Sequence, residues 1–281
     1  MGKRSYIKKT AEIEIYIDSK FPGIIFKQYS SEFIRELERE RKKLIAIQKD
    51  ENWPGFMFKP QIVSKIRSGS FRAGYPFLAN GMTLKEYLKS NEISITTCAR
   101  FINNLESDVL GAEDYIFPDL ANSKNIMILP SSTPMQNYKC IDPDDVLFGE
   151  YRRLNRGALG ISLSLLKNDA YAAGLEKCIE GVIPNKQMDI RSIFALLYII
   201  FNSKESFYPC LWQKNFEDYK AFLRNLNIPV ESELYQKSLQ TLSDTQPNEP
   251  IGNALFELAE QGYEFDKQDN RYCLKKNRWY L

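Results

Sequence analysis

The dominant hydrophobic period of the chain changes near Asn80–Met82, and this change limits the folds that the sequence can adopt. Before it, short apolar segments alternate with charged residues, as in Ala11–Ile17, which is typical of half-buried strands. One densely charged segment, Ser30–Lys49, instead places its apolar residues near helical spacing. After Gly81 the apolar residues recur mostly at helical spacing. We therefore predict an α+β protein with a β-rich first part and a larger helical second part.

Turn and capping residues set the predicted boundaries of the elements. Phe21-Pro22-Gly23 forms a turn, and Thr83 can cap a helix. The predicted strands are Ala11–Ile17, Ile24–Tyr29, Phe56–Phe58, Ile62–Ile66 and Ala73–Leu78. The predicted helices are Ser30–Lys49, Leu84–Lys89, Ile93–Leu110, Asp189–Asn202, Glu217–Leu226, Glu231–Leu242 and Ile251–Gln261. A hairpin is predicted over Tyr263–Tyr280, with its turn near Asp269-Asn270.

Histidine is absent from the chain, and this excludes several classes of active site. Catalysis by Ser-His-Asp or Cys-His groups and every His-ligated metal site require that residue. The 38 Lys and Arg residues against 36 Asp and Glu residues give a net charge of +2. Such a balance gives no reason to expect a nucleic-acid or membrane-surface partner. Any catalysis must use carboxylates and lysines, with or without a bound cation.

The cysteines and the apolar segments indicate the compartment. The five cysteines are widely spaced and form no CxxC pair, which argues against a zinc or redox site and for reduced thiols. The basic stretch Met1–Thr10 is not followed by the apolar region of a signal peptide. The most apolar stretch, Ile193–Phe201, is too short to span a bilayer. We expect a cytoplasmic protein.

Acidic residues gather in one part of the sequence. Residues 101–150 hold nine acidic residues and two basic ones. Two of the acids, Asp119 and Asp142, directly adjoin apolar sequence and are candidates for strand ends. Mg²⁺ takes hard oxygen ligands, usually one or two protein carboxylates completed by substrate phosphates. These two aspartates are therefore candidates for a magnesium-dependent site.

The segment Phe117–Ile128 resembles the catalytic loop of the protein-kinase superfamily, HRDLxxxNIL. The resemblance implies that Asp119 accepts or orients the proton of the attacking hydroxyl. It also implies that Asn125, which precedes Ile-Met-Ile, is a metal ligand. The spacing is one residue longer than in the family, so Asn122 is a competing candidate for the metal ligand.

Two later segments extend the resemblance. Cys140–Asp144 is similar to the kinase DFG segment, in which Asp142 would bind the Mg²⁺ that bridges the ATP phosphates. Asp144 either adds a ligand or faces solvent. Asp189–Tyr198 resembles the start of the helix that anchors the larger lobe in kinases. By this resemblance Asp189 holds the backbone of the catalytic loop, whereas its local alternative is a helix N-cap.

The first part of the chain supplies the nucleotide-binding residues that the resemblance implies. Ile25-Phe26-Lys27 resembles the strand that bears the ATP-binding lysine, so Lys27 would contact the phosphates. Glu40 best fits the glutamate that pairs with this lysine, and Glu36, one turn earlier, is the alternative. Phe77–Asn80 would be the hinge, in which the backbone of Phe77, Leu78 and Ala79 binds the adenine.

The resemblance implies one bilobal, protein-kinase-like domain over 1–281. Residues 1–79 would form a small β-rich lobe, and residues 80–281 a larger helical lobe with a helical extension and a C-terminal hairpin. The implied function is transfer of phosphate from ATP, with Mg²⁺, to Ser or Thr hydroxyls of a protein. No GxGxxG occurs in the first 25 residues, and Pro118 replaces the Arg of HRD. A pseudokinase that acts as an interaction module is therefore the first alternative, and an unrelated α+β interaction protein is the second.

Overall fold

The structure is a computed structural model of the chain, and its fold is α+β. It describes residues 3–10, 13–31, 34–67, 69–117, 120, 122–151, 186–201, 216–242, 250–268 and 271–277. These residues form seven α-helices and several antiparallel sheets, the largest of which has five strands. The chain divides into two compact units, unit 1 (1–81 and 139–144) and unit 2 (82–138 and 145–281). Unit 1 ends at Gly81, close to the predicted boundary, and it also includes a segment that follows much later in sequence.

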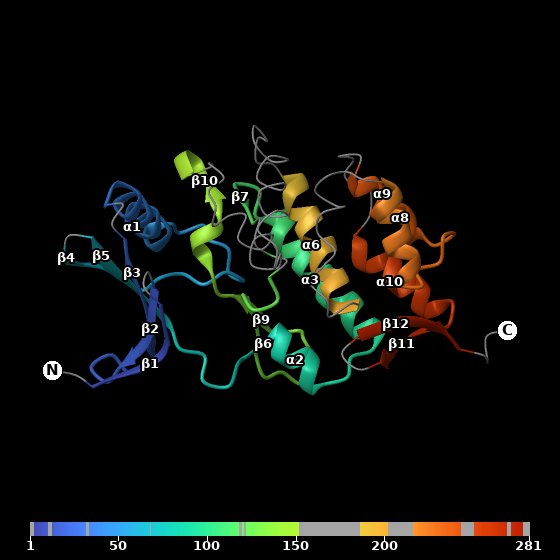
Figure 1. The fold of residues 1–281 in the computed structure, drawn as a ribbon, viewed down its shortest axis with the longest axis horizontal. Helices are drawn as coiled ribbons and strands as arrows, with labels where there is room; N and C mark the ends of the chain where they lie inside the picture. Colours follow the sequence, from blue (N-terminus) through green and yellow to red (C-terminus); the bar gives the residue numbers. More distant parts are fainter. Residues whose placement is uncertain are drawn as a thin grey trace. The chain divides into compact units, whose positions relative to one another are not determined.

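A five-stranded antiparallel sheet forms most of unit 1 (Figure 1). Its spatial order is β1-β2-β3-β5-β4. The strands are β1 (Arg4–Lys9), β2 (Ile13–Asp18), β3 (Ile24–Ser30), β4 (Ile62–Arg67) and β5 (Ser70–Pro76). The turn between β2 and β3 contains Gly23, whose φ of 78° lies in the left-handed region that favours glycine.

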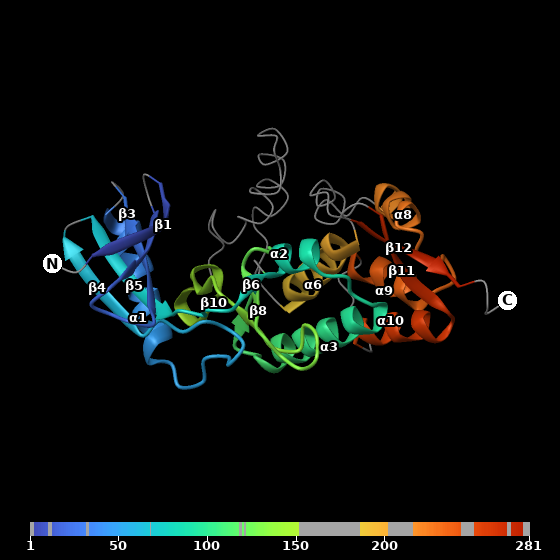
Figure 2. The ribbon, with the colours of Figure 1, turned by 90° about the horizontal axis from the view of Figure 1, so that it is seen from below.

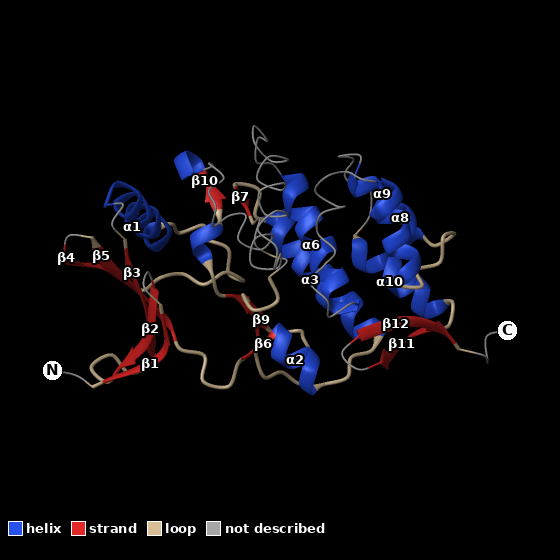
Figure 3. Ribbon diagram, viewed as in Figure 1, coloured by secondary structure: helices blue, strands red, loops and turns tan. Residues whose placement is uncertain are grey.

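Helix α1 (Ile34–Lys49) packs against β4 and β5 on one side of this sheet (Figure 3). Leu44 and Ile47, three residues apart, are fully buried, as expected for the inward stripe of an amphipathic helix. Lys43 lies next to this stripe and is only 5% exposed. A lysine so deeply buried needs a polar partner, which the functional site supplies.

The segment between α1 and β4 holds residues 139–144 in unit 1. Met57 forms an isolated parallel bridge with Cys140, in place of the strand predicted over Phe56–Phe58. The backbone N–H of Phe58 donates to the carbonyl of Cys140 at 2.8 Å, and the N–H of Cys140 donates to that of Phe56 at 2.8 Å. These backbone bonds fix the residues just before Asp142.

Unit 2 contains the other six helices. They are α2 (Leu84–Ser90), α3 (Ile95–Gly111), α6 (Lys186–Phe201), α8 (Phe216–Asn225), α9 (Glu233–Leu242) and α10 (Ile251–Glu260). Thr83 and Glu86 form the reciprocal capping box of α2, so the predicted cap is confirmed. The nearly continuous apolar sequence of α6 is buried from Ile193 to Phe201, apart from one partly exposed position. No helix in the described ranges is long and apolar enough to cross a lipid bilayer.

Helices α3 and α10 lie side by side in unit 2 (Figure 2). Gly252 permits this close approach, because a Cβ atom there would lie 2.5 Å from the carbonyl oxygen of Ala99 on α3. The carboxylate of Glu106 on α3 accepts a hydrogen bond of 2.6 Å from the backbone N–H of Ile251. Glu106 therefore satisfies one of the free N–H groups at the start of α10.

Short strands complete the described part of unit 2. The hairpin predicted near Asp269 is present as two antiparallel strands, β11 (Tyr263–Gln268) and β12 (Arg271–Lys276). β7 (Tyr115–Ile116) pairs with β10 (Leu147–Phe148). β6 (Met82–Thr83) pairs with β8 (Ile126–Ile128). Strand β9 (Tyr138–Cys140) leads into the 139–144 segment of unit 1.

Candidate functional site

Lys27 lies on β3 near the middle of the five-stranded sheet. In the antiparallel register it stands opposite Ile15 of β2 and Ala73 of β5. Directly opposed residues share one face of a sheet, and so do residues two positions apart on one strand. Ile25 and Tyr29 therefore share the face of Lys27. The lysine side chain is 17% exposed, so its ammonium group requires partners within the protein.

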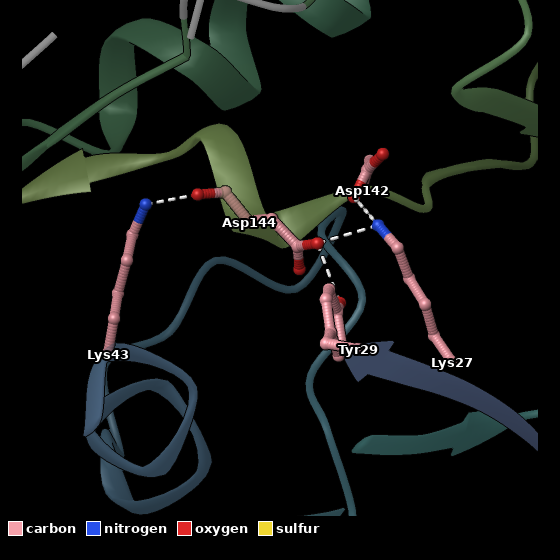
Figure 4. A network of polar contacts seen from close by, with 5 residues as sticks. All are labelled: Lys27, Tyr29, Lys43, Asp142 and Asp144. Carbon is pink, nitrogen blue, oxygen red and sulfur yellow. Dashed lines mark hydrogen bonds and ion pairs between the residues drawn. The ribbon is translucent and has the colours of Figure 1, made fainter. Parts of the chain in front are cut away.

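Two aspartates pair with Lys27 (Figure 4). Its Nζ atom lies 2.8 Å from Oδ1 of Asp142 and 2.6 Å from Oδ2 of Asp144. The sequence places these aspartates more than a hundred residues after the lysine. They come together because Cys140 is anchored to the 56–58 segment and the chain then forms a single 3₁₀ turn, Pro143–Asp145.

Tyr29 and Lys43 fix the position of Asp144 (Figure 4). The hydroxyl of Tyr29 donates to Oδ2 of Asp144 at 2.6 Å, and Nζ of Lys43 donates to the backbone carbonyl of the same residue. Tyr29 is itself stacked on Phe71, with ring centroids 4.6 Å apart. Asp144 thus receives hydrogen bonds from three side chains, two on β3 and one on α1.

The charges of this cluster are mutually dependent. Burial alone would lower the pKa of Lys27, but the carboxylates of Asp142 and Asp144 outweigh it and raise that pKa well above its usual value. Burial raises the pKa of Asp142, and Lys27 only partly offsets it. Burial also acts to raise the pKa of Asp144, yet the charge and hydrogen bonds of its donors hold it below the usual value. Asp144 is therefore the more firmly ionised of the two carboxylates.

Glu40 lies close to this cluster, but Lys27 has other partners. The described ion pairs join Lys27 to Asp142 and Asp144, and none joins it to Glu40. Oε1 of Glu40 is buried and has no hydrogen-bond partner among the described residues. Burial and the nearby charge of Asp144 raise the pKa of Glu40 to about 7. The side chain of Glu36, the alternative from the sequence, lies outside the described residues.

The segment that would bind an adenine ring follows β5. Phe77 and Ala79 are exposed, and Leu78 is partly exposed. The backbone N–H of Phe77 donates to the carbonyl of Gly23 at 2.8 Å, so that donor is used within unit 1. The N–H of Gly81 donates to the carbonyl of Leu78 at 3.2 Å and closes the turn that follows.

Of the residues expected in the catalytic loop, Asp119 lies outside the described residues. Asn122 and Asn125 belong to unit 2, in the turn before β8. The side-chain oxygen of Asn122 accepts a hydrogen bond from the backbone N–H of Lys124 at 3.2 Å. The carbonyl of Asn122 accepts another from the N–H of Asn125 at 2.8 Å. The amide oxygen of Asn122 therefore stabilises the turn.

Asp189 makes the backbone contact that the resemblance predicted. Its Oδ1 atom accepts a hydrogen bond of 2.6 Å from the N–H of Phe117, and its Oδ2 atom lies 3.0 Å from Nζ of Lys186. Lys186 also donates to the carbonyls of Val109 and Ala112, at the end of α3, at 2.8 Å each. Burial raises the pKa of Asp189 to about 7, although Lys186 acts in the opposite direction. Asp189 and Lys186 thus join the start of α6 to the end of α3 and to Phe117.

Sequence reasoning missed Tyr29 and Lys43 as members of the cluster. Tyr29 could have been found, because it follows Lys27 by two positions on a predicted strand and must share its face. Lys43 follows Glu40 by three positions and lies on the same side of the helix. In a helix with so many charged residues, that spacing alone does not single it out.

A metal ion at this cluster would need oxygen ligands from outside the described side chains. No group of three or more Cys, Asp or Glu side chains within the described residues could hold a metal by itself. The carboxylate of Asp142 is 27% exposed and offers hard oxygen donors. Mg²⁺ commonly binds through one or two carboxylates together with phosphate oxygens.

Comparison of the sequence with models of protein families and with curated proteins finds no match.

Proposed function

We propose that the chain is a phosphotransferase of the protein-kinase type that uses ATP and Mg²⁺ and acts on Ser or Thr hydroxyls of a protein. The observation that carries the proposal is the 2.8 Å contact between Lys27 and Asp142. The resemblance in sequence assigned these residues separately, Lys27 to the nucleotide phosphates and Asp142 to the metal. Their side chains meet although 115 positions separate them in the chain.

The order of elements in unit 1 also supports the proposal. In protein kinases the phosphate-binding lysine lies on the third strand and a helix follows with a glutamate directed toward it. Here Lys27 lies on β3, and α1, which bears Glu40, is the next element in the chain. This support is by analogy, because a fold can host several activities.

The surroundings of Lys27 suit a nucleotide. Ile15, Ile17 and Ile25 are partly exposed and lie on the same sheet face as the lysine. An apolar surface beside a buried ammonium group can pack against a planar base while the cation binds its phosphates. The proposed ligand is therefore a nucleotide whose phosphates lie near Lys27.

In the proposed reaction this chain supplies charge and orientation. Lys27 stays protonated and gives the phosphates a fixed positive partner. Asp142 would hold the magnesium ion, which when bound neutralises charge on the phosphate oxygens. Asp119 would accept the proton of the attacking hydroxyl. The proposed partners are the nucleotide and a protein substrate in the cytoplasm, with no nucleic acid or membrane partner.

Isothermal calorimetry with ATP, in the presence and absence of Mg²⁺, tests the proposal on wild type and on Asp142→Asn. We expect binding that requires Mg²⁺ and that weakens about tenfold or more in the variant, because a charged ligand is lost. Glu113→Gln, which changes an exposed acid in unit 2, is the control and should bind as wild type. Wild type that binds no ATP at millimolar concentration would rule out the proposed site.

The second candidate function is an interaction module of the same kind without phosphoryl transfer. One observation favours it: Lys27 is paired with two carboxylates and not with Glu40. Incubation with ATP, Mg²⁺ and a library of Ser and Thr peptides separates the two functions. Nucleotide binding without phosphate transfer would favour the module.

A further inference from the structure

We infer that Asp144, fixed in place by Tyr29 and Lys43, is the residue that positions Lys27, and that Glu40 does not have this role. The inference deepens the proposed function and rests on it for its link to nucleotide binding. The carboxylate that positions Lys27 would therefore come from the 142–144 segment, whereas the sequence resemblance assigned it to helix α1.

The two carboxylates on Lys27 are held very differently. Asp144 is 15% exposed, and its Oδ2 atom accepts hydrogen bonds from both Lys27 and Tyr29, at 2.6 Å each. Its backbone carbonyl accepts a third bond, from Lys43. Asp142 is more exposed, at 27%, and Figure 4 marks one contact of its side chain, the ion pair with Lys27. Asp142 is thus free to exchange Lys27 for another cation, whereas Asp144 is fixed from two elements.

A lysine side chain has several freely rotating bonds, so it needs a fixed partner to present its charge in one place. If Asp142 turns toward a metal-bound nucleotide, Asp144 can still hold Nζ of Lys27 through the bond of 2.6 Å. The aromatic ring of Tyr29, whose centroid lies 5.2 Å from that Nζ atom, restricts it further. Lys27 therefore keeps its position while one of its partners is exchanged.

Glu40 lacks the contacts that this role requires. Its Oε1 atom is buried without a hydrogen-bond partner among the described residues, and no described ion pair joins it to Lys27. On α1 it is Lys43, one turn later, that reaches the site. The helix therefore contributes a donor to Asp144 and not an acceptor to Lys27.

The reactivity of Lys27 toward acetic anhydride, followed by mass spectrometry, tests this assignment without nucleotide. Only the unprotonated amine reacts, and we expect Asp144→Asn to raise its rate about tenfold, which corresponds to one unit of pKa. Tyr29→Phe and Lys43→Met leave the carboxylate present but less firmly held, and they should raise the rate by a smaller factor. Glu40→Gln should change the labelling rate of Lys27 less than Asp144→Asn does, because no described ion pair joins Glu40 to Lys27. The exposed Lys20 and Lys49 are internal references, since partial unfolding would alter their neighbours as well.

The same variants are then titrated with Mg·ATP. Weaker binding in Asp144→Asn and Tyr29→Phe, together with the labelling pattern above, supports the inference. Faster labelling in Glu40→Gln than in Asp144→Asn would overturn it, as would unchanged labelling in Asp144→Asn. If wild type binds no Mg·ATP but the labelling pattern holds, the proposed function fails while the assignment of Asp144 to Lys27 stands.

Discussion

The carboxylate of Asp189 accepts a hydrogen bond from the backbone N–H of Phe117 at 2.6 Å, and 72 positions of sequence separate the two residues. Phe117 is 2% exposed and Asp189 is fully buried. A buried N–H group without an acceptor is costly, so this bond fixes the backbone just before the predicted catalytic loop.

Asp189→Ala should therefore destabilise unit 2. The change leaves the N–H of Phe117 without its acceptor and removes the ion-pair partner of Lys186, and these two losses together should cost at least about 2 kcal/mol. Urea unfolding followed by circular dichroism measures this free energy. Asp189→Asn keeps an oxygen acceptor and is the matched control, so it should cost less. Equal losses in both variants would show that the charge of Asp189 matters and the bond to Phe117 does not.

The stability of unit 2 should depend on the ionisation of Glu106. Burial raises the pKa of Glu106 in the folded protein from 4.5 to about 7, against a smaller opposing effect of the N–H of Ile251. Because its pKa is raised, the Glu106 carboxyl binds its proton more tightly in the folded protein than in the unfolded chain. This proton contributes fully to the free energy of unfolding below the pKa of the unfolded chain, and the contribution is lost as the pH rises through about 7.

In wild type the unfolding free energy should fall between pH 5 and pH 8 as Glu106 ionises, and Glu106→Gln should make this decrease smaller. The difference should be at most about 3 kcal/mol, given the size of the rise in the pKa of Glu106. The amide can still accept the N–H of Ile251 but does not ionise. Urea unfolding at several pH values measures the difference between variant and wild type. Parallel pH profiles for the two proteins would contradict the prediction.

Gly252→Ala should weaken the contact between α3 and α10. A Cβ atom at this position would lie 2.0 Å from Oδ1 of Asn103 and 2.5 Å from the carbonyl oxygen of Ala99. The side chain can move, but the backbone oxygen requires a shift of the helix, and overpacking of this kind costs about 1–3 kcal/mol. Thermal unfolding measures the loss. Gly111→Ala, where a Cβ has no neighbour within 4 Å, is the control and should be at least as stable as wild type.

Lys27→Met should destabilise unit 1 more than a surface lysine does. The variant leaves the partly buried carboxylates of Asp142 and Asp144 without their ammonium partner, and the loss of such charged hydrogen bonds costs about 1–3 kcal/mol. Lys20→Met, at an exposed position, is the control and should change the unfolding free energy little. Equal stability of the two variants in urea would show that the cluster does not depend on Lys27.

Much of the secondary structure could be predicted from the sequence, because caps and periodicity are local. Helix α2 begins after its predicted cap Thr83, and the predicted hairpin is present as the antiparallel pair β11 and β12. Strand β1 was missed. Its sequence, Arg4–Lys9, has only Tyr6 and Ile7 as apolar residues and is exposed throughout, so it has no alternating pattern. It forms through backbone pairing with β2, which no local pattern reveals.

The site was predictable only in part. Lys27 and Asp142 were singled out one at a time from local motifs, and the structure brings their side chains into contact. The role of Lys43 was not predicted, because the resemblance directed attention to Glu40 and Glu36 on this helix. That Lys43 reaches Asp144 depends on where the 142–144 segment lies, and that depends on pairing between Met57 and Cys140, far apart in sequence.

Both outer strands of the five-stranded sheet carry an irregularity in register, between Tyr6 and Lys8 in β1 and between Lys65 and Arg67 in β4. Each irregularity is flanked by basic side chains that are exposed. A foreign strand that approached either edge would meet a kinked backbone and a positive charge, two features that oppose edge-to-edge aggregation. Both edges of the sheet that bears Lys27 are therefore unfavourable for the addition of a further strand.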